Sequence, residues 1–199
     1  MKNLFYSVGE KSFEYYSNAR TVTCKSQHHK CINCGKICFE PIMPPFDYMV
    51  QGKRLGDIMS VLPGYYLVSK NVYELFEINN ISGVSFSKEI TCIEWHDRKG
   101  MKINQSFPNY YYMIIEGKCG DVILSNGKSI PKCPDCNSLR CSFGIKTAFY
   151  INDWDGSDVF THNFATGMIC TEKVKNLVEK SNLKNFDFKA YRCTSKKQL

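Results

Sequence analysis

The sequence lacks the features that mark exported and membrane-spanning proteins. Its apolar runs are short: one of the longest, Tyr110–Ile115, cannot cross a bilayer as a helix. Polar and charged residues interrupt residues 1–20 throughout, unlike the apolar centre of a signal peptide. We therefore expect a cytoplasmic protein with no membrane partner.

Motifs of common active sites are also missing. The sequence has no glycine-rich phosphate loop, no GxSxG motif and no HExxH motif. Its 4 histidines, among them His96 and His162, show no pattern with a nearby nucleophile. We therefore predict that the protein is not an enzyme.

Long runs of basic residues are absent as well. The 26 Lys and Arg residues exceed the 19 Asp and Glu residues, which gives a net charge of +7. They are spread along the chain, however, whereas nucleic-acid-binding proteins usually concentrate positive charge on one face or helix. Nucleic acid is therefore the less favoured partner, and the mild positive charge also suits an acidic protein.

Cysteine, by contrast, is plentiful, and four cysteines form two short pairs. The chain has 11 cysteines, an odd number that favours metal ligation in a reducing compartment over a set of disulfides. Cys31 and Cys34 form one CxxC pair, and Cys133 and Cys136 form another. Each member of the second pair lies 102 positions after its counterpart in the first.

The same offset of 102 relates a second pair of segments. It places residues 69–88 on residues 171–190 without a gap. Five positions are then identical: Val72/Val174, Leu75/Leu177, Glu77/Glu179, Asn80/Asn182 and Phe86/Phe188. Because one offset fits two unrelated features, we interpret the chain as two copies of one unit.

The two cysteine pairs together predict one structural zinc site. Zn²⁺ takes four ligands tetrahedrally, and paired thiolates with two-residue spacers can bind one ion from tight turns. Gly35 and Asn137 follow the pairs and tolerate the positive φ that such turns often need. The predicted ligands are Cys31, Cys34, Cys133 and Cys136.

Other interpretations of the cysteines stay open. They could be ordinary buried thiols, which pack like small hydrophobic side chains. A thioredoxin-like redox site is less favoured, because it would use a single CxxC pair at the start of a helix. The sequence also leaves open whether neighbouring residues take part in metal binding: Cys24, Cys38, Cys141, His28 and His29.

Each copy is expected to contain a strand, a helix and a second strand. In the first copy, Ser69 follows an expected strand at residues 65–68 and is a suitable N-cap for a helix to about Asn79. Asn80 suits the left-handed position that ends a helix. Thr171 and Asn182 take the same places in the second copy.

The segments between the copies are expected to be β-strands. Strands are predicted over residues 90–95 and 109–116. Alternate residues of Tyr110–Ile115 must face opposite sides, which leaves open whether one aromatic face is exposed or both are buried. Asp153, Asp155 and Asp158, with Gly156, favour a tight turn over a calcium-binding loop, because the EF-hand spacing is missing.

Together these patterns predict an α+β fold. We expect internally duplicated strand–helix–strand units, a mixed or antiparallel sheet and a zinc-ribbon-like four-cysteine site. The whole chain, residues 1–199, would form one domain from two similar halves, approximately 1–100 and 101–199. The shared zinc site would join the halves.

The chain resembles the double-CXXCG motif family of bacterial polymorphic-toxin immunity proteins. The resemblance rests on the two cysteine pairs, the segment 154–160 (WDGSDVF) and the strand–helix–strand pattern over residues 167–191. Asn137 replaces the second glycine of the family motif and leaves the cysteines intact. The resemblance implies a non-enzymatic protein that binds and neutralises a toxin made by the same cell.

Two other functions stay as alternatives. A zinc-containing nucleic-acid-binding or regulatory protein would show a contiguous basic face and salt-dependent binding to DNA or RNA. An enzyme that uses the metal is the weaker alternative, because four cysteine ligands leave no coordination position for water.

Overall fold

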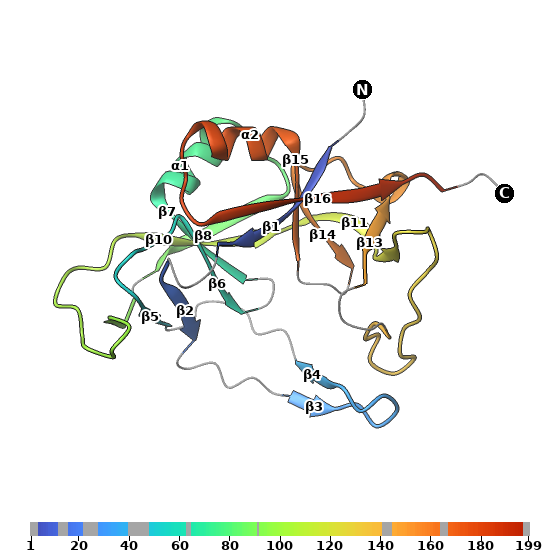
Figure 1. Ribbon diagram of the computed structural model, residues 1–199, viewed down its shortest axis with the longest axis horizontal. Coiled ribbons are helices and arrows are strands. Elements are labelled where there is room, and N and C mark those ends of the chain that lie inside the picture. Colours follow the sequence, from blue (N-terminus) through green and yellow to red (C-terminus); the bar gives the residue numbers. More distant parts are fainter. Residues whose placement is uncertain are drawn as a thin grey trace.

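The computed structural model describes residues 4–11, 16–21, 28–39, 48–62, 65–90, 92–140, 145–163 and 167–196. Within these ranges the protein is mostly β (Figure 1). The α-helices are α1 (Lys70–Ile78) and α2 (Glu172–Lys180), and a 3-10 turn spans Ile151–Asp153. The predicted α+β class is therefore confirmed in part, with much more strand than helix.

The largest sheet has seven strands in the order β11-β14-β15-β1-β16-β13-β12. It is mixed, because β11 pairs with β14 and β13 pairs with β16 in parallel, while the other neighbours are antiparallel. The strands are β1 (Phe5–Glu10), β11 (Gly117–Asp121), β12 (Ile123–Leu124), β13 (Thr147–Tyr150), β14 (Val159–Asn163), β15 (Met168–Thr171) and β16 (Phe186–Thr194).

Three smaller sheets complete the described fold. A four-stranded antiparallel sheet has the order β6-β7-β10-β8, with β6 (Ile58–Leu62), β7 (Tyr65–Ser69), β10 (Tyr110–Ile115) and β8 (Val84–Ile90). A three-stranded sheet has the order β2-β5-β9, with β2 (Asn18–Thr21), β5 (Tyr48–Gln51) and β9 (Glu94–His96). The hairpin of β3 (His28–Lys30) and β4 (Ile37–Phe39) lies beneath the body in Figure 1.

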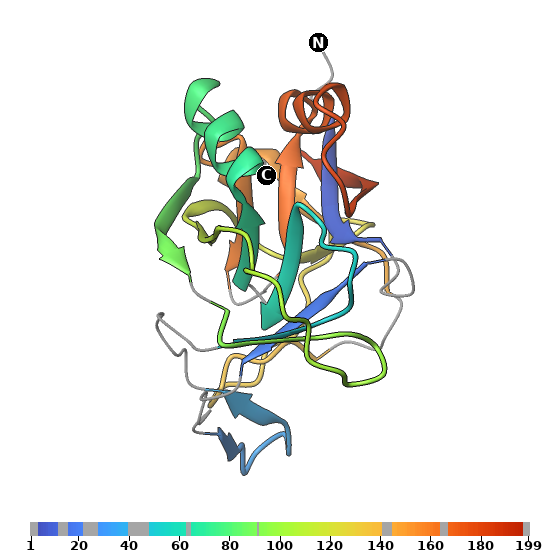
Figure 2. The same ribbon diagram turned by 90° about the vertical axis from the view of Figure 1, so that its left-hand side faces the viewer.

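Two parts of the fold have the same succession of elements. One is β7-α1-β8 and the other is β15-α2-β16. Strand order also corresponds: β6-β7-β10-β8 in one sheet matches β14-β15-β1-β16 in the other, and all these neighbours are antiparallel. Figure 2 shows α1 and α2 next to each other at the top of the molecule.

Each half of the chain supplies one strand to the sheet of the other half. Strand β10 belongs to the second half but pairs with β7 and β8 of the first. Strand β1 belongs to the first half but pairs with β15 and β16 of the second. The halves at residues 1–100 and 101–199 are therefore intertwined.

The helix boundaries follow the expected local signals. Ser69 is the N-cap of α1, and its hydroxyl accepts a hydrogen bond from the Val72 N–H at 3.5 Å. Asn80 has a φ of 48°, and the Ile81 N–H donates to the Phe76 carbonyl at 3.0 Å. The first bond satisfies an N–H group at the start of the helix, and the second satisfies a carbonyl at its end.

Helix α2 ends in the same way but begins differently. Asn182 has a φ of 52°, and the Leu183 N–H donates to the Val178 carbonyl at 3.2 Å. Thr171 is the N-cap residue, as predicted, but its side chain makes no capping bond within the helix. Its hydroxyl lies 3.3 Å from an oxygen of Asp158 instead.

One apolar core joins the two halves. It contains Val72 and Phe76 of α1, Val174 and Val178 of α2, and Met113 of β10, all almost fully buried. Burial of one such side chain contributes roughly 1.5–3 kcal/mol to stability. Because residues of both halves share this core, neither half is expected to fold alone.

The aromatic strand β10 is buried on both faces. Tyr110 and Tyr112 are 3% and 1% exposed and pack in a core beneath the four-stranded sheet. On the opposite face Met113 is 1% exposed, and the Tyr111 ring stacks on Tyr73 with centroids 4.3 Å apart. This strand therefore offers no exposed aromatic surface.

One predicted strand is wrong. Residues 90–95 were expected to form a single strand, but Ile90 ends β8 and Glu94 begins β9. Strand β8 pairs with β10, whereas β9 pairs with β5 in a different sheet. The chain leaves one sheet for another within this segment.

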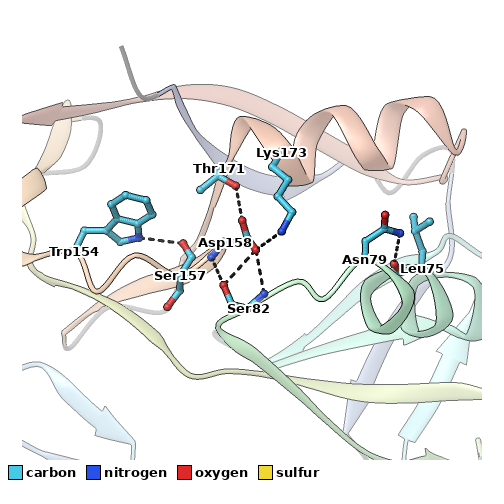
Figure 3. A network of polar contacts seen from close by, with 8 residues as sticks. All are labelled: Leu75, Asn79, Ser82, Trp154, Ser157, Asp158, Thr171 and Lys173. Carbon is cyan, nitrogen blue, oxygen red and sulfur yellow. Dashed lines mark hydrogen bonds and ion pairs between the residues drawn. The ribbon is translucent and has the colours of Figure 1, made fainter. Parts of the chain in front are cut away.

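Two aspartates connect the halves reciprocally. Asp158 accepts hydrogen bonds from the Ser82 N–H at 3.1 Å and from Lys173 Nζ at 2.8 Å (Figure 3). Asp57 accepts from the Ser69 hydroxyl and from the Lys184 N–H, both at 2.6 Å. Each aspartate thus lies before one helix and holds the loop that follows the other.

The loop before Asp158 is the tight turn expected from its sequence. Asp155 accepts hydrogen bonds from the Ser157 N–H at 2.9 Å and the Lys118 N–H at 2.7 Å. Gly156 between them has a φ of 89°. Trp154 closes the turn by donating its indole N–H to the Ser157 carbonyl at 3.0 Å (Figure 3).

Replacing Asp158 with asparagine should lower the free energy of unfolding at pH 7 by about 1–3 kcal/mol, because charged hydrogen bonds are lost. Burial raises the pKa of Asp158, but Lys173 and Ser82 outweigh this and hold the pKa below 3.8. The contribution of Asp158 is therefore complete above about pH 4 and disappears as the pH falls through the native pKa. Urea denaturation at several pH values measures both effects.

Asp187→Asn is the matched control. Asp187 lies 3.3 Å from Lys189, and the side chain of Lys189 is 78% exposed. An exposed ion pair of this kind contributes roughly 0–1 kcal/mol. Equal losses in the two variants would contradict the assigned role of Asp158.

Among the described residues, no helix is long and apolar enough to cross a membrane.

Candidate metal centre

Two similar turns carry the cysteine pairs, and we call them the knuckles. The first lies between β3 and β4 and contains Cys31 and Cys34. The second contains Cys133 and Cys136 and is closed by an isolated bridge between residues 132 and 139. In Figure 1 the hairpin of the first knuckle approaches the yellow segment that contains the second.

The backbone of the two knuckles is nearly the same. Gly35 has a φ of 70° and donates its N–H to the Cys31 carbonyl at 2.8 Å. Asn137 has a φ of 56° and donates to the Cys133 carbonyl at 2.9 Å. Because Asn tolerates positive φ better than most residues, Asn137 can take the place of the second glycine.

The four sulfur atoms converge. Cys31 Sγ lies 3.7 Å from Cys133 Sγ, and Cys34 Sγ lies 3.5 Å from Cys136 Sγ. All four sulfurs lie within 4.8 Å of one another. With Zn–S bonds of about 2.3 Å, the edges of a tetrahedron of sulfurs are about 3.8 Å long. The cluster therefore has the size of a four-thiolate metal site.

Hydrogen bonds stabilise the thiolate forms of the two cysteines in the second knuckle. The Ser138 hydroxyl lies 3.2 Å from Cys136 Sγ, and with the Ser138 N–H it lowers the pKa of Cys136 to about 5. The Cys136 N–H lowers the pKa of Cys133. Since metal ligands must be thiolates, these donors favour metal binding.

The pKa of Cys34 shifts in the opposite direction from those of Cys133 and Cys136. The Lys36 N–H lowers the pKa of Cys34, but burial and the thiols around it outweigh this and raise the pKa to about 12. Four thiolates at this separation repel one another, so they cannot all ionise without a cation. A divalent cation would remove this conflict.

Contacts between the knuckles hold the cluster together. Lys36 Nζ donates to the Leu139 carbonyl. Arg140 donates to the Asn33 side chain at 3.3 Å. The sequence indicated which four cysteines converge, but it gave no sign of these supporting residues, because each contact joins positions more than 100 residues apart.

Among the described residues, Cys38 and His29 fall outside the group of four sulfurs. Cys38 is half-buried beside the cluster, where burial and Cys136 raise its pKa. His29 is exposed. The side chain of His28 and the whole of Cys24 and Cys141 lie outside the described residues.

The geometry disfavours a thioredoxin-like redox site. Neither CxxC pair begins a helix. The sulfur separations of 3.5 and 3.7 Å join different knuckles and exceed a disulfide bond of about 2.05 Å. Convergence of four thiols also differs from the packing of isolated buried cysteines.

A buried cysteine–histidine contact was missed by the sequence patterns. Cys119 Sγ lies 3.4 Å from His162 Nδ1, and His162 Nε2 lies 2.9 Å from the Tyr191 hydroxyl. Burial raises the pKa of Cys119 to about 12 and lowers that of His162 to about 4. The thiol and imidazole are therefore both neutral at pH 7, whereas a catalytic pair needs a thiolate.

This contact belongs to a packed structural cluster. Cys119 is 0% exposed and His162 is 5% exposed. The Phe149 ring stacks on Tyr191 with centroids 6.3 Å apart. The pair lies 43 positions apart in the sequence, so no local motif could have revealed it.

Comparison with known protein families gives a match over most of the chain. The sequence matches the model of an immunity protein family, Imm11, over residues 40–192, which is more than half of the chain. The matched region includes the second knuckle and the 154–160 segment, while Cys31 and Cys34 precede it. A search of curated proteins found no match.

Proposed function

The chain belongs to the immunity protein family Imm11, which confirms the resemblance to immunity proteins, and we propose that it binds and neutralises a toxin made by the same cell. The family match over residues 40–192 carries this proposal. Neutralisation would follow from occupancy of the toxin, without chemistry by the immunity protein. A cytoplasmic location is part of the same proposal.

The proposed metal is one structural Zn²⁺ held by Cys31, Cys34, Cys133 and Cys136. The tetrahedral size of the sulfur cluster and the exclusively thiolate donor set support zinc. Four protein ligands would close the coordination sphere and leave no position for a reacting water. The role of the zinc would be to join the two knuckles.

We also infer that the chain arose by internal duplication. Support comes from the equal sequence offsets, the corresponding strand orders and the reciprocal aspartates. In this interpretation residues 1–199 form one domain, with a strand exchanged between its halves and a zinc ion shared by them.

Binding of the toxin encoded next to this protein is the direct test. The purified protein should form a one-to-one complex with nanomolar affinity, which corresponds to about −12 kcal/mol. Toxin activity should fall in proportion to the immunity protein added and disappear at equimolar amounts. Titration calorimetry and a toxin-activity titration measure the two quantities, and co-expression should restore growth.

Two results would contradict this function. Protection by substoichiometric amounts without a detectable complex would indicate an enzyme that modifies the toxin or repairs its target. Failure to bind any adjacent toxin, with salt-sensitive binding to DNA or RNA, would favour the zinc-containing nucleic-acid-binding alternative.

A further inference from the structure

Two loops lie next to each other at one end of the three-stranded sheet. Strands β5 and β9 pair in parallel, with Gln51 opposite His96, so the loops that follow them leave the sheet together. The Gly52 N–H donates to the His96 carbonyl at 2.8 Å. Trp95 Nε1 donates to the Gly52 carbonyl at 2.7 Å. These bonds fix the two loops relative to each other.

The loops concentrate positive charge. Residues 52–55 and 97–105 contain five exposed basic residues and a single acidic residue, Asp97. The basic residues are Lys53, Arg54, Arg98, Lys99 and Lys102. We call this surface the basic loop face, and it lies at the left of Figure 1 near β5.

Asp97 offsets one of these five positive charges, and its carboxylate also organises the loop. It accepts hydrogen bonds from the Lys99 N–H at 2.9 Å and the Met101 N–H at 3.0 Å. These N–H groups, with Lys53 at 3.8 Å, lower the pKa of Asp97. The loop is therefore a rigid hairpin turn, which reduces the entropy lost when a partner binds.

The basic loop face also contains a hollow with apolar and charged residues in its lining. A hollow of about 480 Å³ is lined by three apolar side chains, Trp95, Met101 and Ile103, and by the polar residues Lys53, Asp97, Lys102 and Gln105. Met101 is 68% exposed. A second hollow of about 380 Å³ adjoins it, since both share Lys53 and Asp97. Apolar side chains beside charged ones are typical of protein–protein interfaces.

We propose that the basic loop face binds an acidic segment of the toxin that inserts an apolar side chain between Trp95 and Met101. This proposal rests on the proposed function and names the surface that would perform it. Charge complementarity would speed association and select the partner, while the apolar side chain would supply affinity.

The same surface is less suited to single-stranded nucleic acid. Such sites commonly present aromatic rings on which bases stack. The Trp95 ring is half-buried, and it packs edge-on against Phe107 with centroids 5.4 Å apart. Its N–H is already bonded to Gly52.

A charge-reversal pair tests the proposal. The probe is the toxin domain encoded next to this protein, and the variant is Lys99→Glu with Lys102→Glu. The association rate should fall at least about tenfold, and its dependence on salt should weaken. Surface plasmon resonance at several salt concentrations measures both. Met101→Asp should weaken the complex mainly by faster dissociation.

The control makes the same change of charge elsewhere. Lys128→Glu with Lys146→Glu alters exposed residues next to β12 and β13, and β13 lies opposite β5 in Figure 1. This control should bind like the wild type, and melting curves should show that all variants are folded. Equal binding by both double variants would overturn the proposal.

Other outcomes separate the remaining explanations. If the wild type binds no adjacent toxin, the proposed function fails and this surface assignment fails with it. If Lys99→Glu with Lys102→Glu abolishes binding to a 20-nucleotide DNA or RNA but leaves toxin binding unchanged, the face is a nucleic-acid site and the proposal is wrong.

Discussion

Replacing Cys34 and Cys136 together with serine should remove the zinc from the protein. Each substitution takes one ligand from a different knuckle, and two remaining thiolates cannot hold a closed tetrahedral site. Protein purified without added metal should contain about one zinc per chain, and the double variant about none. Elemental analysis measures the content, and full zinc retention would contradict the ligand assignment.

The structural consequence should be concentrated in the knuckles. The described residues form three clusters of buried apolar side chains, around Val72, Tyr112 and Phe149, and none of the four cysteines belongs to them. The first hairpin has little apolar burial of its own, because Ile32 and Ile37 are 102% and 55% exposed. Metal binding is therefore expected to supply most of the free energy that holds this hairpin in place.

Limited proteolysis should detect this local unfolding. Lys30 and Lys36 flank the first pair of cysteines and are exposed trypsin sites. Loss of the metal should accelerate cleavage there by about tenfold or more, because protease attacks the open form of a segment. Cys38→Ser is the matched control, since Cys38 is a neighbouring cysteine outside the group of four. It should keep both zinc and protease resistance.

The two helices could be predicted because the residues that start, bury and end each helix lie close together in the sequence. A cap residue, an apolar stripe and a left-handed Asn lie within twelve positions, and they located both helices correctly. The equal spacing of the two CxxC pairs also indicated which four cysteines would meet. That inference needed only the assumption that equal spacing reflects equivalent structure.

The remaining features depend on contacts between distant residues. No pattern within β1 or β10 indicates that each strand joins the sheet of the other half. The Cys119–His162 contact likewise joins the paired strands β11 and β14, and the basic loop face forms where β5 and β9 end side by side. The segment from Ile90 to Trp95 has the composition of one strand, yet it divides between two sheets.

Gly83→Ala should cause one of the largest losses of stability among single substitutions. Gly83 has a φ of 82°, and a Cβ there would lie 2.0 Å from the Val159 carbonyl oxygen. Its own carbonyl accepts the Glu116 N–H at 2.9 Å and the Gly117 N–H at 3.1 Å, so the backbone cannot easily move. We expect the free energy of unfolding to fall by more than about 3 kcal/mol, measured by urea denaturation.

Gly127→Ala is the control that measures the cost of backbone strain without a steric clash. Gly127 has the same φ of 82°, but a Cβ there would meet nothing within 4 Å. Its substitution should cost only about 1–2 kcal/mol, the strain of a left-handed residue. Similar losses in the two variants would show that Gly83 does not lie against the Val159 backbone.

The contact equivalent to that of Gly83 lies at Asn185 in the other half, and the backbone approaches closely at both places. Asn185, with a φ of 73°, corresponds to Gly83, and its side chain donates to the Ile58 carbonyl at 2.6 Å. A Cβ on the facing Gly56 would lie 2.4 Å from Asn185 Cβ, while the side chain facing Gly83 is Ser157. Each of these two contacts therefore has room for only one side chain. In one contact the side chain is that of Ser157, facing Gly83, and in the other it is that of Asn185, facing Gly56. Gly56→Ala should accordingly destabilise the protein as Gly83→Ala does, and a loss no greater than that of Gly127→Ala would refute this account of the junction.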